Sequence, residues 1–440
     1  MDSECVIPLR DVSIRITKGT TPTTVGHYFL DSGINFVKSE AIGNDGTLDG
    51  STFAFISENT HAALARSQLK EGDVLFSMAG VYLGKTAVVP KSILPANTNQ
   101  AVGIIRLDPD KADPRYIHYV LSSSTCRSWV QRSVAQSAQP NFNLADIGDL
   151  PIPNVPLGTQ RAIAHILGTL DNRVELHKKM NQTLESMARA LFKSWFVDFD
   201  PVRANMEGRD PGLTKEIADL FPSRMAESEL GEIPEGWEVK SFAETVEILG
   251  GGTPKTSVTE YWNGDIPWFS VVDAPTGSDV WVVETEKKVT RDGIENSSAQ
   301  VLPICTTIIS ARGTVGRIAL TGAPMAMNQS CYGLRPRNGA RGFFTYFATR
   351  ELVTRLQQHA HGSVFDTITR DTLAGVVVVE PPSALIRHFE VQAAPMLERI
   401  RTDLLCSVSL AALRDTLLPK LISGELRVKD PEKFVPRVGA

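Results

Sequence analysis

The chain has 440 residues, 42% of them hydrophobic and 22% charged, a composition typical of a globular protein with two or three domains. Its net charge of −5 argues against a protein that coats nucleic acid indiscriminately, although a local basic face is still possible. No stretch approaches 18 apolar residues, so we expect no membrane-spanning helix and no signal peptide. Five scattered cysteines without C-x-x-C spacing favour free thiols and a cytoplasmic location.

The first part of the chain, residues 1–156, has the pattern of a β-rich globular domain. Short apolar runs at 33–39, 73–78 and 85–89 are bounded by Gly, Pro and Asn clusters, which is typical of strands joined by turns. A helical pattern follows at 114–134, and a group of prolines then interrupts the chain.

Residues 157–200 carry the strongest periodicity in the chain. Apolar side chains recur at steps of four and three, and no proline follows until Pro201. The pattern predicts one helix of about forty residues, roughly 60 Å long, with Thr159 as its N-cap and Pro201 as its end. Only His177 and Asn181 interrupt the apolar seam, and we interpret them as polar residues that set helix register rather than as metal ligands. Such a helix needs a partner of similar length.

The next two parts are a linker and a second globular domain. Residues 201–235 have little periodicity, which indicates a linker, and residues 236–382 repeat the motifs of the first domain about 230 positions later. The matched motifs, in order, are Gly19–Pro22 with Gly251–Pro254, Ile34–Lys38 with Ile266–Ser270, Leu75–Gly80 with Ile308–Gly313, Asn99-Gln100 with Asn328-Gln329, and Leu150–Pro153 with Val379–Pro382. Five matches in order predict a domain duplication.

A second long helix is expected at 383–427, followed by a tail at 428–440. Its apolar stripe, which includes Leu413, is looser than the first, and Pro395 puts its starting point in question. The predicted fold is therefore α+β: two duplicated β-rich domains separated by two long antiparallel helices that form a coiled coil with pseudo-two-fold symmetry. Such helices would act as a ruler for a bipartite target whose halves lie a fixed distance apart.

No catalytic set or metal-ligand spacing is visible in the sequence. The segment Ala79–Thr86 fits a loose phosphate-loop pattern, but the residues after it indicate a strand rather than the helix that such a loop must open. The second copy keeps the glycines and loses the pattern, which favours a tight β-turn. Two alternatives stay open: a P-loop-type ATP-binding enzyme subunit that uses Lys85, and a coiled-coil scaffold without DNA readout.

Two stretches are locally basic within this acidic chain. Seven arginines and one acid lie between Ala311 and Arg355, and seven basic residues and three acids lie between Ser77 and Arg132. This is the footprint of phosphate contacts, although a solvated charged face has the same pattern. The polar loops supply the candidate DNA-binding residues, whose amides could contact adenine edges or cap turns. They are Thr20, Thr21, Lys38, Lys85, Asn99, Gln100, Gln139, Asn141, Thr253, Lys255, Thr256, Arg312, Arg317, Asn328 and Gln329.

Four motifs give the chain a resemblance to a known family. They are Leu170–Leu176, Met187–Pro201, Gly231–Trp237 and Leu413–Leu426. With them the chain resembles the specificity subunit of type I restriction–modification systems over nearly its whole length.

The resemblance implies a non-catalytic subunit of a restriction enzyme and adenine-specific DNA methyltransferase complex. Two target-recognition domains would each bind one half of a split site in double-stranded DNA. The conserved helices would hold two methyltransferase (M) subunits, and restriction (R) subunits would join them. S-adenosylmethionine, ATP and magnesium would be bound by those partners, and no cofactor by this chain.

Overall fold

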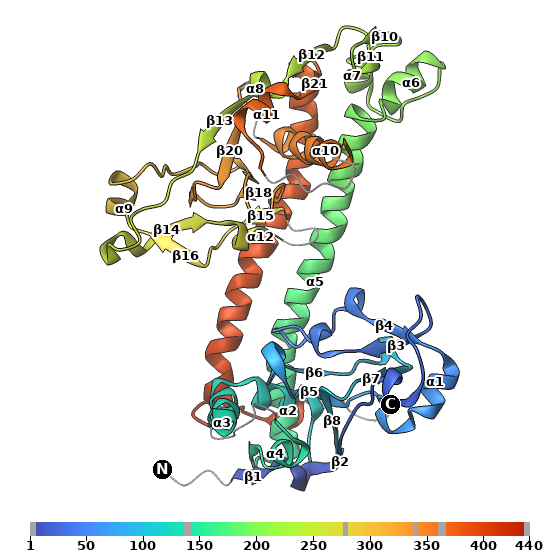
Figure 1. Cartoon of the computed structure of the whole chain (residues 1–440), viewed down its shortest axis with the longest axis vertical. Coiled ribbons are helices and arrows are strands. Elements are labelled where there is room, and N and C mark those ends of the chain that lie inside the picture. Colours follow the sequence, from blue (N-terminus) through green and yellow to red (C-terminus); the bar gives the residue numbers. More distant parts are fainter. Residues whose placement is uncertain are drawn as a thin grey trace. The chain divides into compact units, whose positions relative to one another are not determined.

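The computed structural model describes residues 6–135, 142–275, 280–337, 339, 342–359 and 367–434. The chain forms two compact units, one of residues 1–173 and 410–440 and the other of residues 174–409. Each unit combines one β-rich domain with part of both long helices (Figure 1). The predicted α+β class is confirmed. No helix in the described ranges is both long and apolar enough to cross a bilayer.

The first unit contains two small sheets and a closing strand pair. An antiparallel sheet has the order β2 (Ser13–Lys18), β8 (Val102–Leu107), β5 (Val74–Ser77) and β6 (Thr86–Val88). A mixed sheet has the order β4 (Ala54–Ile56), β3 (Ile34–Val37) and β7 (Ala96–Thr98), with β3 antiparallel to β4 and parallel to β7. Strands β1 (Val6–Pro8) and β9 (Pro151–Pro153) pair antiparallel, so the two ends of this domain lie side by side. The three predicted strands are β3, β5 and β6.

Four short helices complete the first domain: α1 (Glu58–Ala63), α2 (Pro114–Ser122), α3 (Ser124–Ala135) and α4 (Leu144–Gly148). The single helix predicted at 114–134 is thus two helices. The break lies at Ser123, whose extended backbone ends α2 while its hydroxyl accepts a hydrogen bond from the Cys126 amide in the first turn of α3. A serine hydroxyl competes with helical backbone pairing in this way, and hydrophobic periodicity does not register it.

The second unit repeats this topology. Its larger sheet has the order β13 (Val246–Gly250), β20 (Cys331–Pro336), β17 (Thr307–Ser310), β18 (Ile318–Thr321) and β15 (Trp281–Val282). Its mixed sheet has the order β16 (Lys287–Val289), β14 (Trp262–Phe269) and β19 (Ala326–Met327), with β14 antiparallel to β16 and parallel to β19. Strands β12 (Glu238–Ser241) and β21 (Val377–Glu380) close the domain as β1 and β9 do. Apart from β15, every strand described between residues 236 and 382 has its counterpart in the first domain, which confirms the predicted duplication.

The helices of the second domain are α8 (Phe242–Thr245), α9 (Arg291–Glu295), α10 (Phe343–His359) and α11 (Arg370–Gly375). The preceding segment, expected as a linker at 201–235, contains α6 (Asp200–Met206), α7 (Lys215–Ala218) and the hairpin β10 (Met225–Ser228) and β11 (Gly231–Pro234). Its apolar residues Val202, Ile217 and Phe221 are buried in the core of the second unit. Elements of four to seven residues are too short to show a clear periodicity, so the pattern of apolar residues did not predict them.

The long helices are α5 (Leu157–Phe196) and α12 (Ser383–Ile422), of forty residues each. They pack antiparallel in both units. In the first unit, Arg414 of α12 bonds Asp171 of α5 at 2.8 Å, and in the second unit Ser407 lies 3.1 Å from the Nδ1 atom of His177. The predicted helix pair is therefore confirmed, and His177 pairs with the partner helix.

The predicted boundaries of α5 were wrong by a few residues. The helix begins before Thr159, which lies inside its first turn, and it ends at Phe196 rather than at Pro201. Phe199 then takes a left-handed backbone conformation with φ of 56°, which turns the chain, and Pro201 lies in the first turn of α6. Proline is well tolerated at that position because the first helical amides have no intrahelical partner.

Helix α12 runs unbroken through Pro395. Proline deprives the carbonyl four residues earlier of its hydrogen bond, and that residue, Val391, is 69% exposed, so water can replace the missing donor. Phe389 and Ile400 of α12 are fully buried, but Leu413, which the sequence places on the apolar stripe, is 47% exposed.

Candidate nucleic-acid interface

In the first domain, the loop that carries Thr20 and Thr21 is hydrogen-bonded to the loop that carries Asn99 and Gln100. The backbone amide of Gly19 donates to Val102 and that of Thr20 to Thr98, at 3.1 and 3.0 Å. A Cβ atom at Gly19 would lie 2.1 Å from the Thr98 carbonyl oxygen, so only glycine allows this approach. The hydroxyl of Thr21 donates to the side-chain oxygen of Gln100.

Two basic side chains border the same loops. Arg66 donates to the Thr20 hydroxyl at 3.0 Å. Lys38 directly follows β3, and the pairing of Val37 with Thr98 sets Lys38 beside the start of the asparagine–glutamine loop. We call Thr20, Thr21, Lys38, Arg66, Asn99 and Gln100 the first polar loop cluster.

The second domain builds the same arrangement. The hydroxyl of Thr253 donates to the side-chain oxygen of Gln329. A Cβ atom at Gly251 would lie 1.9 Å from the Asn328 carbonyl oxygen, and the Gly252 amide donates to Met327 at 2.9 Å. We call Thr253, Asn328 and Gln329 the second polar loop cluster. The sequence repeat therefore places corresponding side chains in corresponding contacts.

The asparagines and glutamines of these clusters have different roles. The side-chain oxygen of Asn99 accepts from the Ala101 amide at 3.2 Å, and that of Asn328 accepts from Ser330 at 3.1 Å, so both asparagines hold turns. Gln100 and Gln329 are exposed, and within the described ranges their amide nitrogens have no hydrogen-bond partner. A glutamine amide can bond the N6 and N7 edge of adenine. The glutamines are therefore the better candidates for base contacts.

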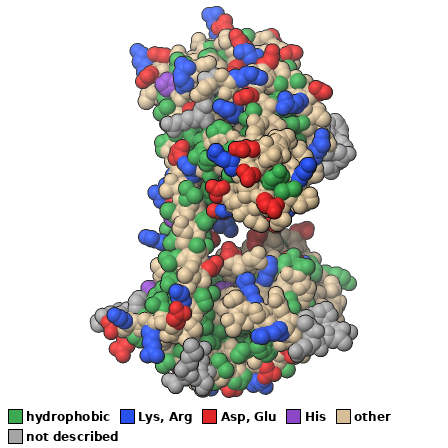
Figure 2. Space-filling model, turned by 90° about the vertical axis from the view of Figure 1, so that its left-hand side faces the viewer, with side chains coloured by type: hydrophobic (Ala, Val, Ile, Leu, Met, Phe, Trp, Pro, Cys, Tyr) green, Lys and Arg blue, Asp and Glu red, His purple; other side chains and the backbone are tan. Residues whose placement is uncertain are grey.

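Most arginines of the basic stretch in the second domain serve the fold. Arg350 pairs with buried Glu185, Arg335 with Glu247 and Arg355 with Glu351, while Arg337 donates to the Val246 carbonyl. Arg341 lies outside the described residues. Arg312 and Arg317, which flank the turn between β17 and β18, are exposed and have no acidic partner in the described part of the chain. On the face drawn in Figure 2, basic and acidic side chains are interspersed rather than gathered in one stripe.

Comparison with known proteins assigns the chain. The model of the type I restriction modification DNA specificity domain matches residues 6–186 and 234–383, which cover the first β-rich domain with most of α5 and the second β-rich domain. The chain belongs to this family. It is a DNA specificity subunit of a type I restriction–modification system, the non-catalytic component that gives such a restriction enzyme its DNA specificity.

Individual relatives agree with this assignment. The specificity subunit of type I restriction enzyme HindI from Haemophilus influenzae is 25% identical over 408 residues, covering 82% of this chain and 88% of the relative. The specificity subunit of type I restriction enzyme MjaIX from Methanocaldococcus jannaschii is 29% identical over 163 residues, covering 37% of this chain and 38% of the relative. The crystal structure of a type I restriction–modification system S subunit from M. genitalium shares the fold, with a TM-score of 0.56, 15% identity and 95% of each chain covered.

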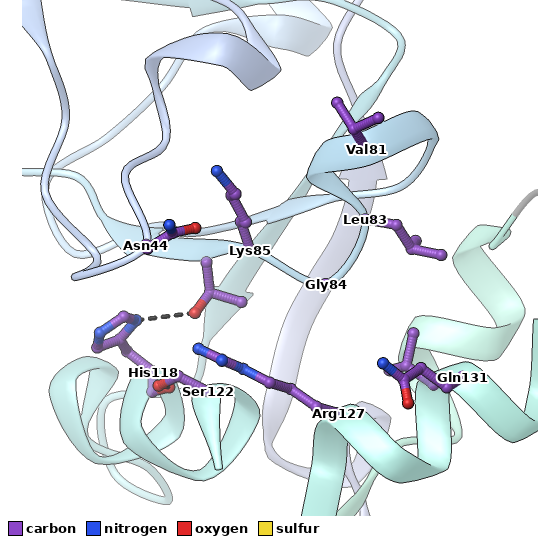
Figure 3. Close-up of a pocket in the computed structure, with 11 residues that line it drawn as sticks. Asn44, Val81, Leu83, Gly84, Lys85, His118, Ser122, Arg127 and Gln131 are labelled. Carbon is purple, nitrogen blue, oxygen red and sulfur yellow. Dashed lines mark hydrogen bonds between the residues drawn. The ribbon is translucent and has the colours of Figure 1, made fainter. Parts of the chain in front are cut away.

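The remaining predicted residues of the specificity subunit lie apart from the clusters or outside the described ranges. Lys85 lies at the start of β6, beside a pocket of the first domain (Figure 3). The residues after it form a strand and not a helix, so the phosphate-loop pattern is a tight turn, with Gly84 at φ of 81°. Lys255 and Thr256 are exposed on the loop that follows Thr253. Gln139 and Asn141 lie outside the described residues.

Sequence reasoning missed two polar residues at these loops. Arg66 contacts Thr20 across 46 positions of chain, and Gln300 donates to the Gly250 carbonyl at 3.1 Å across 50 positions. Neither lies in a repeated motif, so no local signal points to either residue.

Proposed function

We propose that each β-rich domain of this specificity subunit reads one half of a bipartite double-stranded DNA target through its polar loop cluster. The observation that carries the proposal is the repeated contact of threonine with glutamine, Thr21 with Gln100 and Thr253 with Gln329. The hydroxyl holds the glutamine side chain in one orientation, so the free face of the amide is preset for an adenine edge. Different loop residues around a shared scaffold then allow each domain its own half-site.

Phosphate contacts set the position of each domain on the duplex. The cations near the loops suit this task because they are long and flexible. Apart from Lys38, which lies 3.8 Å from Glu40, they have no acidic partner within the described residues. They are Lys85, Lys255, Arg312 and Arg317, with Lys38 and Arg66 at the first cluster. Such contacts fix register and carry little sequence information, whereas groove contacts supply the specificity.

The chain divides functionally into recognition domains and a spacer. Residues 1–156 and 236–382 form the recognition domains, 201–235 the linker and 428–440 the tail. The helical parts at 157–200 and 383–427 determine how far apart the half-sites are on the DNA. Forty helical residues, about 60 Å, are long enough to span more than one turn of duplex.

The long helices also carry the partner subunits. Helices α5 and α12 expose large apolar side chains that a single chain leaves uncovered: Leu176, Met187, Val391, Leu405, Val408 and Leu413. Two methyltransferase subunits cover these positions, and restriction subunits join the assembly. S-adenosylmethionine, ATP and magnesium belong to those partners, which work with this chain on cytoplasmic DNA. The methyltransferase flips one adenine out of each half-site because the target atom is inaccessible in the stacked duplex.

The test is an exchange of domains between two members of the family. Residues 1–156 are replaced by the corresponding domain of a relative with a different target, and the methylated sequences are read from the genome of cells that carry the system. We expect one half-site to change and the other to stay. The reciprocal exchange of residues 236–382 is the matched control and should change only the other half-site. A change in both halves after either exchange would contradict modular recognition.

A further inference from the structure

Lys85, named above as a phosphate contact, lines a pocket in the first domain. It has a volume of about 230 Å³ and lies between the β5–β6 turn and the α2–α3 helices (Figure 3). Its polar lining consists of two cations, two amides, two hydroxyls and an imidazole, and no acid. These residues are Lys85, Arg127, Asn44, Gln131, Thr86, Ser122 and His118.

The two cations enter from different walls. Lys85 directly precedes β6 and its amine points away from Arg127, whereas Arg127 reaches from α3 toward the hydrogen-bonded pair of Thr86 and His118 (Figure 3). Among the described residues neither cation has an acidic partner, and Lys85 lies 4.9 Å from the Tyr82 ring centroid. Because burial lowers the pKa of His118 to about 4, the imidazole is neutral near pH 7. The lining of the pocket therefore includes two cations without an ion-pair partner among the described residues and several hydrogen-bonding side chains, while Asp45 and Asp171 act on His118 from outside the lining.

The rim of the pocket is built to meet a large partner. Val81, at the tip of the turn, is 89% exposed, and Arg127 lies on the exposed side of α3. A small ligand would leave this apolar tip in water. A duplex lying across the turn would cover it.

In the second domain the corresponding helix lies closer to the corresponding turn. In the first domain, a Cβ atom at Gly84 would lie 3.9 Å from the Val130 side chain. At the matched Gly316, a Cβ atom would lie 2.8 Å from Val353 of α10 and 3.5 Å from Gln357. At this position helix α10 therefore packs more closely on its turn than α3 does on the turn of the first domain.

We infer that this pocket binds a backbone phosphate of the DNA that lies against the first domain, with Lys85 and Arg127 as its cationic ligands. The inference rests on the proposed DNA reading and adds a contact beside the first half of the target. The phosphate-loop motif of the sequence thus marks a phosphate site in which side chains, rather than a helix N-terminus, supply the charge.

The test uses the complex of this chain with its methyltransferase subunits and duplexes in which one phosphate at a time is replaced by a neutral methylphosphonate. In the wild-type complex, one position beside the first half-site should weaken binding about three- to tenfold. The double variant Lys85→Gln/Arg127→Gln should lose no further affinity at that position. Its slope of log affinity against log salt should fall by about 1 and not 2, because both cations neutralise one phosphate.

Two matched variants keep the result interpretable. Arg132→Gln removes an exposed cation from the same helix, outside the pocket, and should keep the methylphosphonate effect at that position. Arg127→Lys retains the charge and should keep most of the affinity.

Two outcomes would overturn the inference. In one, the double variant stays sensitive to every methylphosphonate that affects the wild type. In the other, inorganic phosphate or ATP binds the DNA-free complex through Lys85 and Arg127, measured by calorimetry, while DNA affinity is unchanged in the double variant. Wild-type discrimination between the target and a scrambled duplex is measured in parallel. If the wild type does not discriminate between the two duplexes, the proposed function itself is wrong. If it does discriminate, a negative result with the variants concerns the pocket alone.

Discussion

At the scale of single residues, the two domains share one arrangement of side chains. A threonine hydroxyl restrains a glutamine amide, and a glycine without a side chain brings their loops together. The contact at Gly19 and the contact at Gly251 both leave about 2 Å for a Cβ atom, far less than any other residue needs. Loops that are rigid before binding lose less conformational entropy on DNA, so more of the contact energy appears as affinity.

Removing one hydroxyl should damage one half-site only. Thr21→Val keeps the volume of the side chain and frees Gln100, so we expect discrimination against a changed base in the first half-site to fall about 5- to 30-fold. Thr253→Val should have the same effect on the second half-site. Competition binding with duplexes altered in either half measures both variants, and each serves as the control for the other. Equal losses in both half-sites would show that the hydroxyls act on stability.

His118 predicts how the stability of the first domain depends on pH. Burial is the main reason that its pKa falls to about 4, with smaller opposing effects from Asp171 and Arg414. The unfolded chain, with a pKa near 6.5, therefore binds more protons than the folded chain between these values. Stability should drop by roughly 3 kcal/mol as the pH falls from about 6.5 to about 4, and level off below that.

Urea unfolding at pH 7 and pH 4.5 measures this change. The variant His118→Gln should show a flatter pH dependence than the wild type, even if its stability at pH 7 is lower. The same slope in both proteins would mean that another group is responsible.

At the scale of elements, aromatic residues join helix α5 to helix α12 in the second unit. Phe389 of α12 is fully buried, and its ring centroid lies 5.7 Å from that of Phe192 and 5.5 Å from that of Phe196. Phe344 and Phe347 of α10 contact the same ring. The family motif in α5 that carries Phe192 and Phe196 is thus a structural core.

Truncating this ring should weaken the second unit. Phe389→Ala should lower the free energy of unfolding by about 3–5 kcal/mol, because it removes buried area and leaves a cavity. Val391→Ala, two residues away and exposed, should change it by less than about 0.5 kcal/mol. Urea unfolding followed by tryptophan fluorescence would compare them. Similar losses in both variants would be incompatible with this packing.

The sequence predicted the elements whose signal is long or repeated. The forty-residue helices show many turns of one period, and the duplication shows matched motifs in order. What it could not predict depends on single long-range contacts. Glu185 forms an ion pair with Arg350, which therefore does not belong to the basic face, and Thr20 accepts a hydrogen bond from Arg66. Neither pair is visible in a local sequence pattern. The pocket beside Lys85 likewise depends on how closely one helix packs on one turn.

At the scale of the whole molecule, the helices should set the spacer of the DNA target. His177 of α5 pairs with Ser407 of α12, so a lengthened pair needs four residues, about one turn, inserted after Lys178 and four more at the matching turn before Ser407. We expect the methylated sites to keep both half-sites and to acquire a longer spacer. The single insertion in α5 alone is the control, and it should disrupt the helix register. An unchanged spacer with the double insertion would show that the helices do not measure the DNA.

The strand pairs β1–β9 and β12–β21 have an evolutionary consequence. Each pair brings the two ends of a domain together, so the chain enters and leaves that domain at the same place. Recombination between genes at the positions of these paired strands can replace one domain without altering the register of the helices beyond it. On the proposed function, a new pairing of half-sites would therefore need only one genetic event.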